Sequence, residues 1–264
     1  MVTVHEGNSA LIISVPHAGT EIPDDIRQSM TAVAGKVQDT DWYVDRLYQF
    51  AKQLDATMIV ATLSRYVIDL NRDPQDNSLY PGQFTTSLCP VMTFNQERLY
   101  ASENVPSEEQ ICHRREQYWQ PYHDQITAQI SRIKSHHGHA VLLDAHSIAS
   151  RVPELFTGQL SDLNFGTFNG QSCDAALETL VEAIDHGGYS AVLNGRFKGG
   201  FITRHYGAPE QQIHAIQLEL SQATYMNEET KQWDPAKAIR LQRHLGELCQ
   251  QLIAWKPATI ATNT

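Results

Sequence analysis

The sequence predicts an α/β fold in which helices cover both faces of a mixed central sheet, a three-layer αβα arrangement. Short apolar runs rich in β-branched residues alternate with segments of helical periodicity. Several of these runs are almost continuously apolar, which is typical of strands buried on both faces. A chain of 264 residues with 41% hydrophobic content can also fill one large α/β core. We therefore expect a single domain over residues 1–256 and a frayed C-terminal tail over residues 257–264.

The predicted elements follow from periodicity and from start and stop signals. Five strands are expected, at Ala10–Val15, Thr57–Leu63, Ala140–Asp144, Ser190–Leu193 and Ile213–Leu220. Helices are expected at Asp41–Leu54, Ser107–Ser135, Ala175–Ile184 and Pro235–Ala254. In the longest of these, Ser107 and Gln110 predict a capping box, and Pro121 should kink or divide the helix. The long loops at 71–98 and 195–212 are expected to carry function.

Composition narrows the classes of function. The chain has 20 Lys and Arg against 30 Asp and Glu, a net charge of −10 without a basic block, which argues against nucleic acid and anionic membranes as partners. Four cysteines lie far apart in the sequence, as expected of free thiols in a reducing compartment. The N-terminal segment lacks a signal-peptide pattern, and apolar runs are too short for a membrane span. These features predict a cytoplasmic protein with a small-molecule ligand.

Polar residues follow strands or begin a helix in three segments. His17 follows the first strand, Asp39 and Asp41 precede the first helix, and His146 follows the strand that ends at Asp144. Ligands of open α/β sheets bind at the carboxyl ends of strands, so two histidines and a carboxylate could meet there in the pattern of a catalytic zinc site. Taken singly, each histidine is equally compatible with a structural hydrogen bond, and Asp41 with a favourable charge at a helix N-terminus.

Cationic residues gather in two loops of this acidic chain. They are Arg65 and Arg72 in SRYVIDLNRDP, and Arg196, Lys198 and Arg204 in NGRFKGGFITRHYG. Arginine binds carboxylates through a planar fork, and glycine lets the backbone approach a ligand, so these loops suit a small anionic substrate. The alternative is internal ion pairing, for example between Arg72 and Asp73.

Glu219 lies inside the apolar run Ile213–Leu220. A carboxylate is costly to bury unless it is paired or functional, and a raised pKa would suit a general base. The alternative is that the strand end faces water. Histidines within the long helix, such as His113 and His123, are interpreted as surface residues.

Six motifs in order, from about residue 11 to residue 225, resemble the N-formylglutamate amidohydrolase family. They are SVPHAGTEIP, DTDWYVDRLY, YVIDLNRDP, LYPGQFTTSLCP, LLDAHSI and NGRFKGGFITRHYG. The resemblance implies a fold similar to the zinc-dependent exopeptidases (phosphorylase/hydrolase-like). It also implies hydrolysis of N-formyl-L-glutamate to formate and L-glutamate in histidine degradation.

The same resemblance assigns roles to individual residues. It implies His17, Asp41 and His146 as ligands of a divalent metal, with zinc expected and with Asp39 and Asp45 as competing carboxylates. It implies Glu219 as general base, Arg65 or Arg72 as the group that orients a substrate carboxylate, and further substrate contacts from Asn71, Arg196, Lys198 and Arg204. Rival functions are a related zinc N-acyl amino acid deacylase, a carboxypeptidase, or a non-catalytic binder of acidic amino acids. The metal's identity and the oligomeric state stay open.

Overall fold

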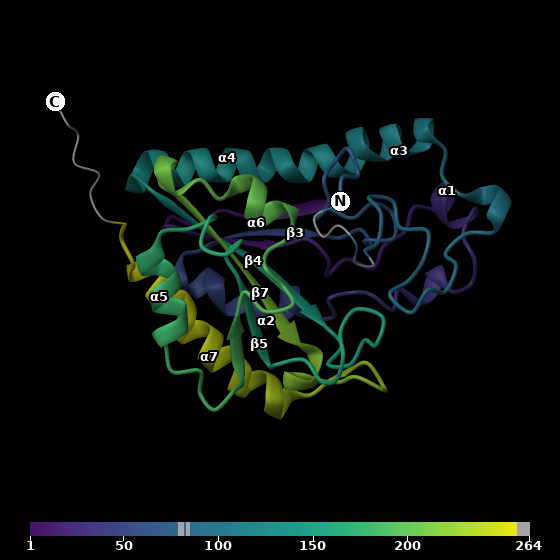
Figure 1. Cartoon of the computed structure of the whole chain (residues 1–264). Helices are drawn as coiled ribbons and strands as arrows, with labels where there is room; N and C mark the ends of the chain where they lie inside the picture. Colours follow the sequence, from purple (N-terminus) through teal and green to yellow (C-terminus); the bar gives the residue numbers. More distant parts are fainter. Residues whose placement is uncertain (79–81, 83–84, 258–264) are drawn as a thin grey trace.

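A computed structural model describes residues 1–78, 82 and 85–257 of the chain. Its centre is a seven-stranded mixed sheet in the order β1-β3-β2-β4-β7-β5-β6 (Figure 1). Strands β3, β2, β4 and β7 run parallel, β1 and β5 run antiparallel to their neighbours β3 and β7, and β6 pairs in parallel with β5. The strands are β1 (Val2–His5), β2 (Leu11–Val15), β3 (Thr57–Ala61), β4 (Ala140–Ile148), β5 (Leu163–Gly166), β6 (Ala191–Leu193) and β7 (Ile213–Ser221).

Helices cover both faces of this sheet, as the apolar strand runs predict. Side chains alternate along a strand, so Ile13 and Leu143 pack in one core while Ile12 and Leu142 pack in the other. The first core also contains residues of α2 (Val44–Leu47), α5 (Ala175–Ala183) and α7 (Pro235–Ala254). The second contains residues of α4 (Gln120–His137) and α6 (Phe201–Tyr206), which lie together on the opposite face (Figure 1).

The strand predictions are confirmed in number and order for the five apolar runs, with one important correction. Strand β4 continues to Ile148 instead of ending at Asp144, because it pairs with β7 as far as Ile148 opposite Ser221. Asp144 and His146 therefore lie within the strand and not beyond its end. Strands β1 and β5 were not predicted, since each has only four residues and neither contains a long apolar run.

The helix predicted at Asp41–Leu54 is wrong in its continuity and its start. The structure has a short α-helix, α2, followed by a separate 3₁₀ helix η2 (Gln49–Leu54). Tyr43, just before α2, has a left-handed backbone with φ of 61°, so Asp41 lies outside the helix. The Asp41 backbone N–H instead donates to the His17 carbonyl at 3.1 Å, which ties this segment to the end of β2.

The long helical region at Ser107–Ser135 is confirmed and proves to be divided. It consists of α3 (Glu108–Arg114), a π-helical segment η4 (Arg115–Trp119), and α4. Ser107 and Gln110 form the predicted capping box, and Pro121 lies in the first turn of α4, directly after the division. Helix α7 has the predicted bounds, and Asp234 caps its start.

The remaining described elements are short. They are α1 (Asp24–Arg27), η1 (Ala34–Lys36), η3 (Ser102–Asn104), η5 (Pro209–Gln211), η6 (Gln222–Thr224) and the two-stranded ribbon of β8 (Met226–Asn227) and β9 (Gln232–Trp233). No helix in the described part of the chain combines the length and apolar character needed to cross a membrane. The predicted tail, from residue 258 onward, and residues 79–81 and 83–84 of the LYPGQFTTSLCP motif lie outside the described residues.

Candidate metal centre and substrate cavity

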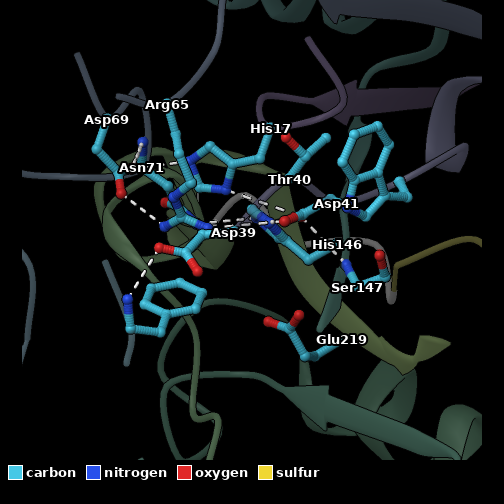
Figure 2. A network of polar contacts seen from close by, with 12 residues as sticks. His17, Asp39, Thr40, Asp41, Arg65, Asp69, Asn71, His146, Ser147 and Glu219 are labelled. Carbon is cyan, nitrogen blue, oxygen red and sulfur yellow. Dashed lines mark hydrogen bonds and ion pairs between the residues drawn. The ribbon is translucent and has the colours of Figure 1, made fainter. Parts of the chain in front are cut away.

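His17, Asp41 and His146 come together from three separate segments (Figure 2). His17 lies two residues beyond β2, Asp41 three residues before α2, and His146 near the carboxyl end of β4. One ligand atom from each lies within 4.8 Å of the others, and all three side chains are buried. The Asp41 Oδ2 atom is 2.9 Å from His146 Nδ1 and 3.8 Å from His17 Nδ1. Among the described residues this is the one such group that could hold a metal ion.

The outer nitrogen of each histidine faces a second carboxylate. His17 Nε2 is 2.8 Å from Asp69 Oδ1, and His146 Nε2 is 3.0 Å from Asp144 Oδ2. Such a pairing fixes the ring and leaves Nδ1 facing inward, as in metal-binding histidines that donate their other N–H to a carboxylate. His17 Nδ1 is buried without a hydrogen-bond partner, and a metal ion would satisfy it. Two imidazole nitrogens and a carboxylate oxygen suit zinc and related divalent metals.

Arg65 balances the negative charge behind these ligands. Its guanidinium is 2.6 Å from Asp69 Oδ2 and 3.6 Å from Asp41 Oδ1, and it lies over the Phe94 ring. Burial alone would raise the pKa of Asp69, but Arg65 and His17 outweigh it and hold the pKa well below the ordinary value. Burial likewise acts against ionised Asp41, yet its contacts with His146 and His17 lower its pKa. Both carboxylates are therefore ionised at neutral pH.

Glu219 stands beside His146, on the neighbouring strand β7. It is the direct register partner of His146 across the β4–β7 ladder, and its carboxylate points toward the same space (Figure 2). The side chain is buried, and burial raises its pKa to about 8. Gln217, two residues earlier on the same face of β7, contacts Glu219 Oε2 through Nε2 at 3.3 Å and accepts a hydrogen bond from the Gly200 N–H. The sequence interpretation missed Gln217, although the period of two from Glu219 would have found it.

These residues open into one cavity, and concave sites of this kind are where small molecules bind. The predicted residues that line it are His17, Asp41, Arg65, Asn71, Arg72, His146, Arg196 and Glu219, and its apolar wall contains Phe94, Ile148, Leu155 and Phe197. Lys198 and Arg204 are not among the described lining residues. Arg204 instead donates to the Gly199 carbonyl at 2.8 Å and stacks over Phe168. Asp39 and Asp45 stand apart from the three-residue group, and Asp39 accepts from the Phe94 N–H.

Two of the three cavity arginines are held by loop carbonyls. Arg72 Nε donates to the Thr86 carbonyl at 2.9 Å, and Arg196 Nε donates to the Leu155 carbonyl at 2.7 Å. Both side chains are half-buried. Arg72 also donates from Nη1 to the Asn71 carbonyl and from Nη2 to Thr86 Oγ1, each at 3.2 Å. Both guanidinium groups border the cavity with their positive charge. The cationic loops predicted from the sequence thus contribute Arg65, Arg72 and Arg196 to the cavity.

The segment that carries Asp69, Asn71 and Arg72 is held from outside by the divided helix. Arg114 donates to the Val67 carbonyl at 3.1 Å, Trp119 Nε1 to the Arg72 carbonyl at 3.1 Å, and His123 Nε2 lies 2.9 Å from the Leu70 carbonyl. We refer to these three side chains as the helix clamp. The prediction that His123 is a surface residue is therefore wrong, since the ring is buried and stacked on Trp119. Helical periodicity alone does not show which loop a helix covers.

A mixed α/β sheet with two histidines, a buried carboxylate and a facing glutamate in one cavity is typical of metal-dependent hydrolases. A family model described as N-formylglutamate amidohydrolase matches residues 9–226. The chain is 45% identical over 258 residues to N-formylglutamate deformylase of Pseudomonas putida, covering 97% of this chain and 96% of that one. It is also 45% identical over 260 residues to N-formylglutamate deformylase of Pseudomonas aeruginosa, covering 97% of each.

A solved structure described as N-formylglutamate amidohydrolase from Ralstonia eutropha JMP134 has the same fold. The TM-score is 0.79 at 24% sequence identity, over 96% of this chain and 97% of that one. The family match and the two relatives show that this chain belongs to the N-formylglutamate amidohydrolase family.

Proposed function

We propose that the protein hydrolyses N-formyl-L-glutamate to formate and L-glutamate, as a metal-dependent step of histidine degradation. The observation that carries this proposal is the cavity in which His17, Asp41 and His146 face Glu219 and a set of arginines. The names of the Pseudomonas relatives and of the family support the substrate. A substrate with two carboxylates also accounts for arginines gathered in one cavity of a protein with a net charge of −10.

His17, Asp41 and His146 would hold the metal ion, with zinc the expected metal. A divalent metal in this position supplies Lewis acidity, which polarises a carbonyl group and lowers the pKa of water toward about 7. Glu219 would accept the proton of the attacking water and return it to the nitrogen that leaves as the C–N bond of the formamide breaks. The water oxygen ends in formate and the proton on L-glutamate, so the reaction balances without another reactant.

The arginines would orient the substrate. Arg72 and Arg196 line the cavity with their positive charge and suit its two carboxylates. Arg65 contacts Asp41 and lines the same cavity. We assign it to catalysis, because it can hold a substrate carboxylate while it fixes Asp41. Lys198, in the loop before Gly200, and Arg204, in α6 after it, stay candidates, although neither is among the described residues that line the cavity.

The fold similarity, the domain bounds and the cellular location belong to the same proposal. The positions of His17 and His146 near the carboxyl ends of β2 and β4, with Glu219 on the adjacent strand β7, support the similarity to zinc-dependent exopeptidases. Helix α7 packs into the same core as β2 and β4, which supports one domain over residues 1–256. The four cysteines are free, which supports the cytoplasmic location predicted from the sequence.

The test is formate release from N-formyl-L-glutamate by the purified protein before and after chelation, with zinc added back. We expect release that stops with chelator and returns with metal. Release from N-acetyl-L-glutamate or short peptides instead would point to an acyl amino acid deacylase or a carboxypeptidase. Binding of glutamate without any product would point to a non-catalytic binder. Formate release from protein that elemental analysis shows to be metal-free would contradict the metal mechanism.

A further inference from the structure

Asn71 was expected to grip a substrate carboxylate together with Arg72, but its side chain is engaged inside the protein. The residue is 4% exposed, although it borders the cavity. Its Oδ1 accepts a hydrogen bond from the Ile202 N–H at 2.8 Å. Its Nδ2 lies 3.1 Å from Asp144 Oδ2 and 2.9 Å from His146 Nε2. Figure 2 shows the amide next to the ligand cluster, with Glu219 on the far side.

The partners of Asn71 fix the orientation of its amide. If the oxygen and nitrogen were exchanged, Oδ1 would face the Asp144 carboxylate and Nδ2 would face the Ile202 N–H, so both contacts would be repulsive. Nδ2 therefore points at Asp144 and His146. A substrate carboxylate can only accept hydrogen bonds, and Nδ2, with its two N–H bonds, is the only donor atom of this side chain. This donor atom lies within hydrogen-bond distance of Asp144 Oδ2 and His146 Nε2, on the outer side of His146.

The contacts among Asn71 Nδ2, Asp144 Oδ2 and His146 Nε2 also determine the His146 tautomer. A histidine ring nitrogen either carries a proton and donates or carries a lone pair and accepts. His146 Nε2 therefore cannot accept from Asn71 and also donate to Asp144. When Nδ1 faces the metal, the proton is on Nε2, which donates to Asp144 Oδ2 at 3.0 Å. Asn71 then donates to the same Asp144 oxygen. Asp144 also lies 3.3 Å from the Ser14 hydroxyl, so this fully buried carboxylate is held by three groups.

Gly200 is what allows Asn71 to reach this position. A Cβ atom placed on Gly200 would lie 2.4 Å from Asn71 Nδ2 and 2.6 Å from Oδ1, closer than real side chains approach. The Gly200 N–H meanwhile donates to Gln217 Oε1. The glycine-rich loop therefore contacts Asn71 directly, in addition to any contact with substrate.

We infer that Asn71 is a positioning residue for the metal centre, which acts through Asp144 to hold His146 in its metal-binding orientation. This inference rests on the proposed metal-dependent function and departs from the expectation that Asn71 holds substrate. Residues that orient a metal-binding histidine typically change metal affinity by 10- to 100-fold when removed. Of the Asn71-Arg72 pair, only Arg72 is then expected to bind substrate.

The test measures metal affinity separately from catalysis. Wild type, Asn71→Ala and Arg72→Ala are titrated with Zn²⁺ alone against a chelator of known affinity, and with Co²⁺ while its visible absorption spectrum is recorded. We expect Asn71→Ala to bind both metals roughly 10- to 100-fold more weakly and to show an altered Co²⁺ spectrum. Arg72→Ala should match wild type in both measurements while its KM for N-formyl-L-glutamate rises.

A second variant keeps the inference testable if Asn71→Ala does not fold. Gly200→Ala leaves Asn71 in the sequence but displaces its side chain, so it should weaken metal binding to a similar degree. Gly246→Ala in α7 is the matched control, because its new Cβ would be no closer than 3.8 Å to any neighbour.

Two results would overturn the inference. Metal affinity of Asn71→Ala and Gly200→Ala within twofold of wild type would do so, whether or not KM rises. A wild-type protein that binds no divalent metal would overturn both this inference and the proposed function, so the two failures are distinguishable.

Discussion

The two halves of the cavity are held in different ways. The metal half consists of His17, Asp41 and His146, which are buried and fixed by charged or backbone partners on both sides. The substrate half consists of Arg72 and Arg196, which are half-buried and donate hydrogen bonds to carbonyl groups of loops. A reaction centre needs fixed geometry, whereas specificity can be carried by loops. Changes in the metal half should therefore abolish turnover, and changes in the substrate half should alter KM.

The largest effect is expected for Glu219→Gln. The glutamine keeps the shape of the side chain and its contact with Gln217 but cannot accept a proton, so kcat should fall by roughly 10²- to 10⁴-fold. Metal content, measured by elemental analysis, should equal that of wild type. His146→Ala is the contrasting variant, since it should lose the metal as well as the activity. Turnover of Glu219→Gln near the wild-type rate would rule out Glu219 as general base.

In the substrate half, Arg72→Ala should raise KM with little change in kcat. Loss of a charge-assisted contact costs about 1.5–3 kcal/mol, which corresponds to roughly 10- to 100-fold in kcat/KM. Arg72→Lys keeps the charge without the planar fork and should lose less.

N-formyl-L-glutamine identifies which carboxylate each arginine holds, because it lacks the side-chain carboxylate. We expect the loss seen in either Arg72→Ala or Arg196→Ala, but not in both, to disappear with this substrate. Unchanged KM in both variants would mean that neither arginine binds substrate.

The three residues that the structure brings together, His17, Asp41 and His146, are those that the sequence indicates. Few residue types can ligate a divalent metal, and His17 and His146 follow predicted strands, but the choice of Asp41 over Asp39 and Asp45 came from the family resemblance. The same argument failed for local detail: β4 extends past His146, and Asp41 precedes its helix without joining it. Both departures arise from tertiary contacts, the pairing with β7 and the hydrogen bond to the His17 carbonyl.

For the substrate half, the sequence predicts only that cationic side chains gather in two loops. Nothing in the spacing of Arg196, Lys198 and Arg204 shows that Arg196 borders the cavity while Arg204 stacks over Phe168. Long side chains take their direction from tertiary neighbours, and these lie far away in the sequence. The helix clamp is the clearest case, because its three side chains bind carbonyl groups 47 to 53 residues earlier.

His123, a member of the helix clamp, should lower the free energy of unfolding in acid. Burial lowers its pKa to about 3, whereas an unfolded histidine titrates near 6.5. The neutral ring is therefore favoured in the folded state, and stability present above pH 6.5 is lost as pH falls toward 3. Between pH 7 and pH 5 this one group should cost about 2 kcal/mol of unfolding free energy.

The measurement is urea denaturation of wild type and His123→Gln at pH 7 and pH 5. The variant lacks the titrating ring, so its loss between the two pH values should be smaller than that of wild type by about the same amount. Equal losses in the two proteins would show that His123 is not held neutral by the fold.

The smallest effect is expected for Trp119→Phe, which removes the hydrogen bond to the Arg72 carbonyl and keeps an aromatic ring against His123. One neutral hydrogen bond contributes about 0.5–1.5 kcal/mol, so KM should rise roughly 2- to 10-fold while kcat changes little. If Trp119→Phe acted through a general loss of packing, KM would rise by the same factor with or without Arg72→Ala. If Trp119 acts by orienting Arg72, however, the rise should vanish when Trp119→Phe is combined with Arg72→Ala, because no guanidinium remains to be misplaced. Steady-state kinetics of the two single variants and the double variant make this comparison, and additive effects on KM would show that the helix clamp stabilises the fold without positioning the substrate half.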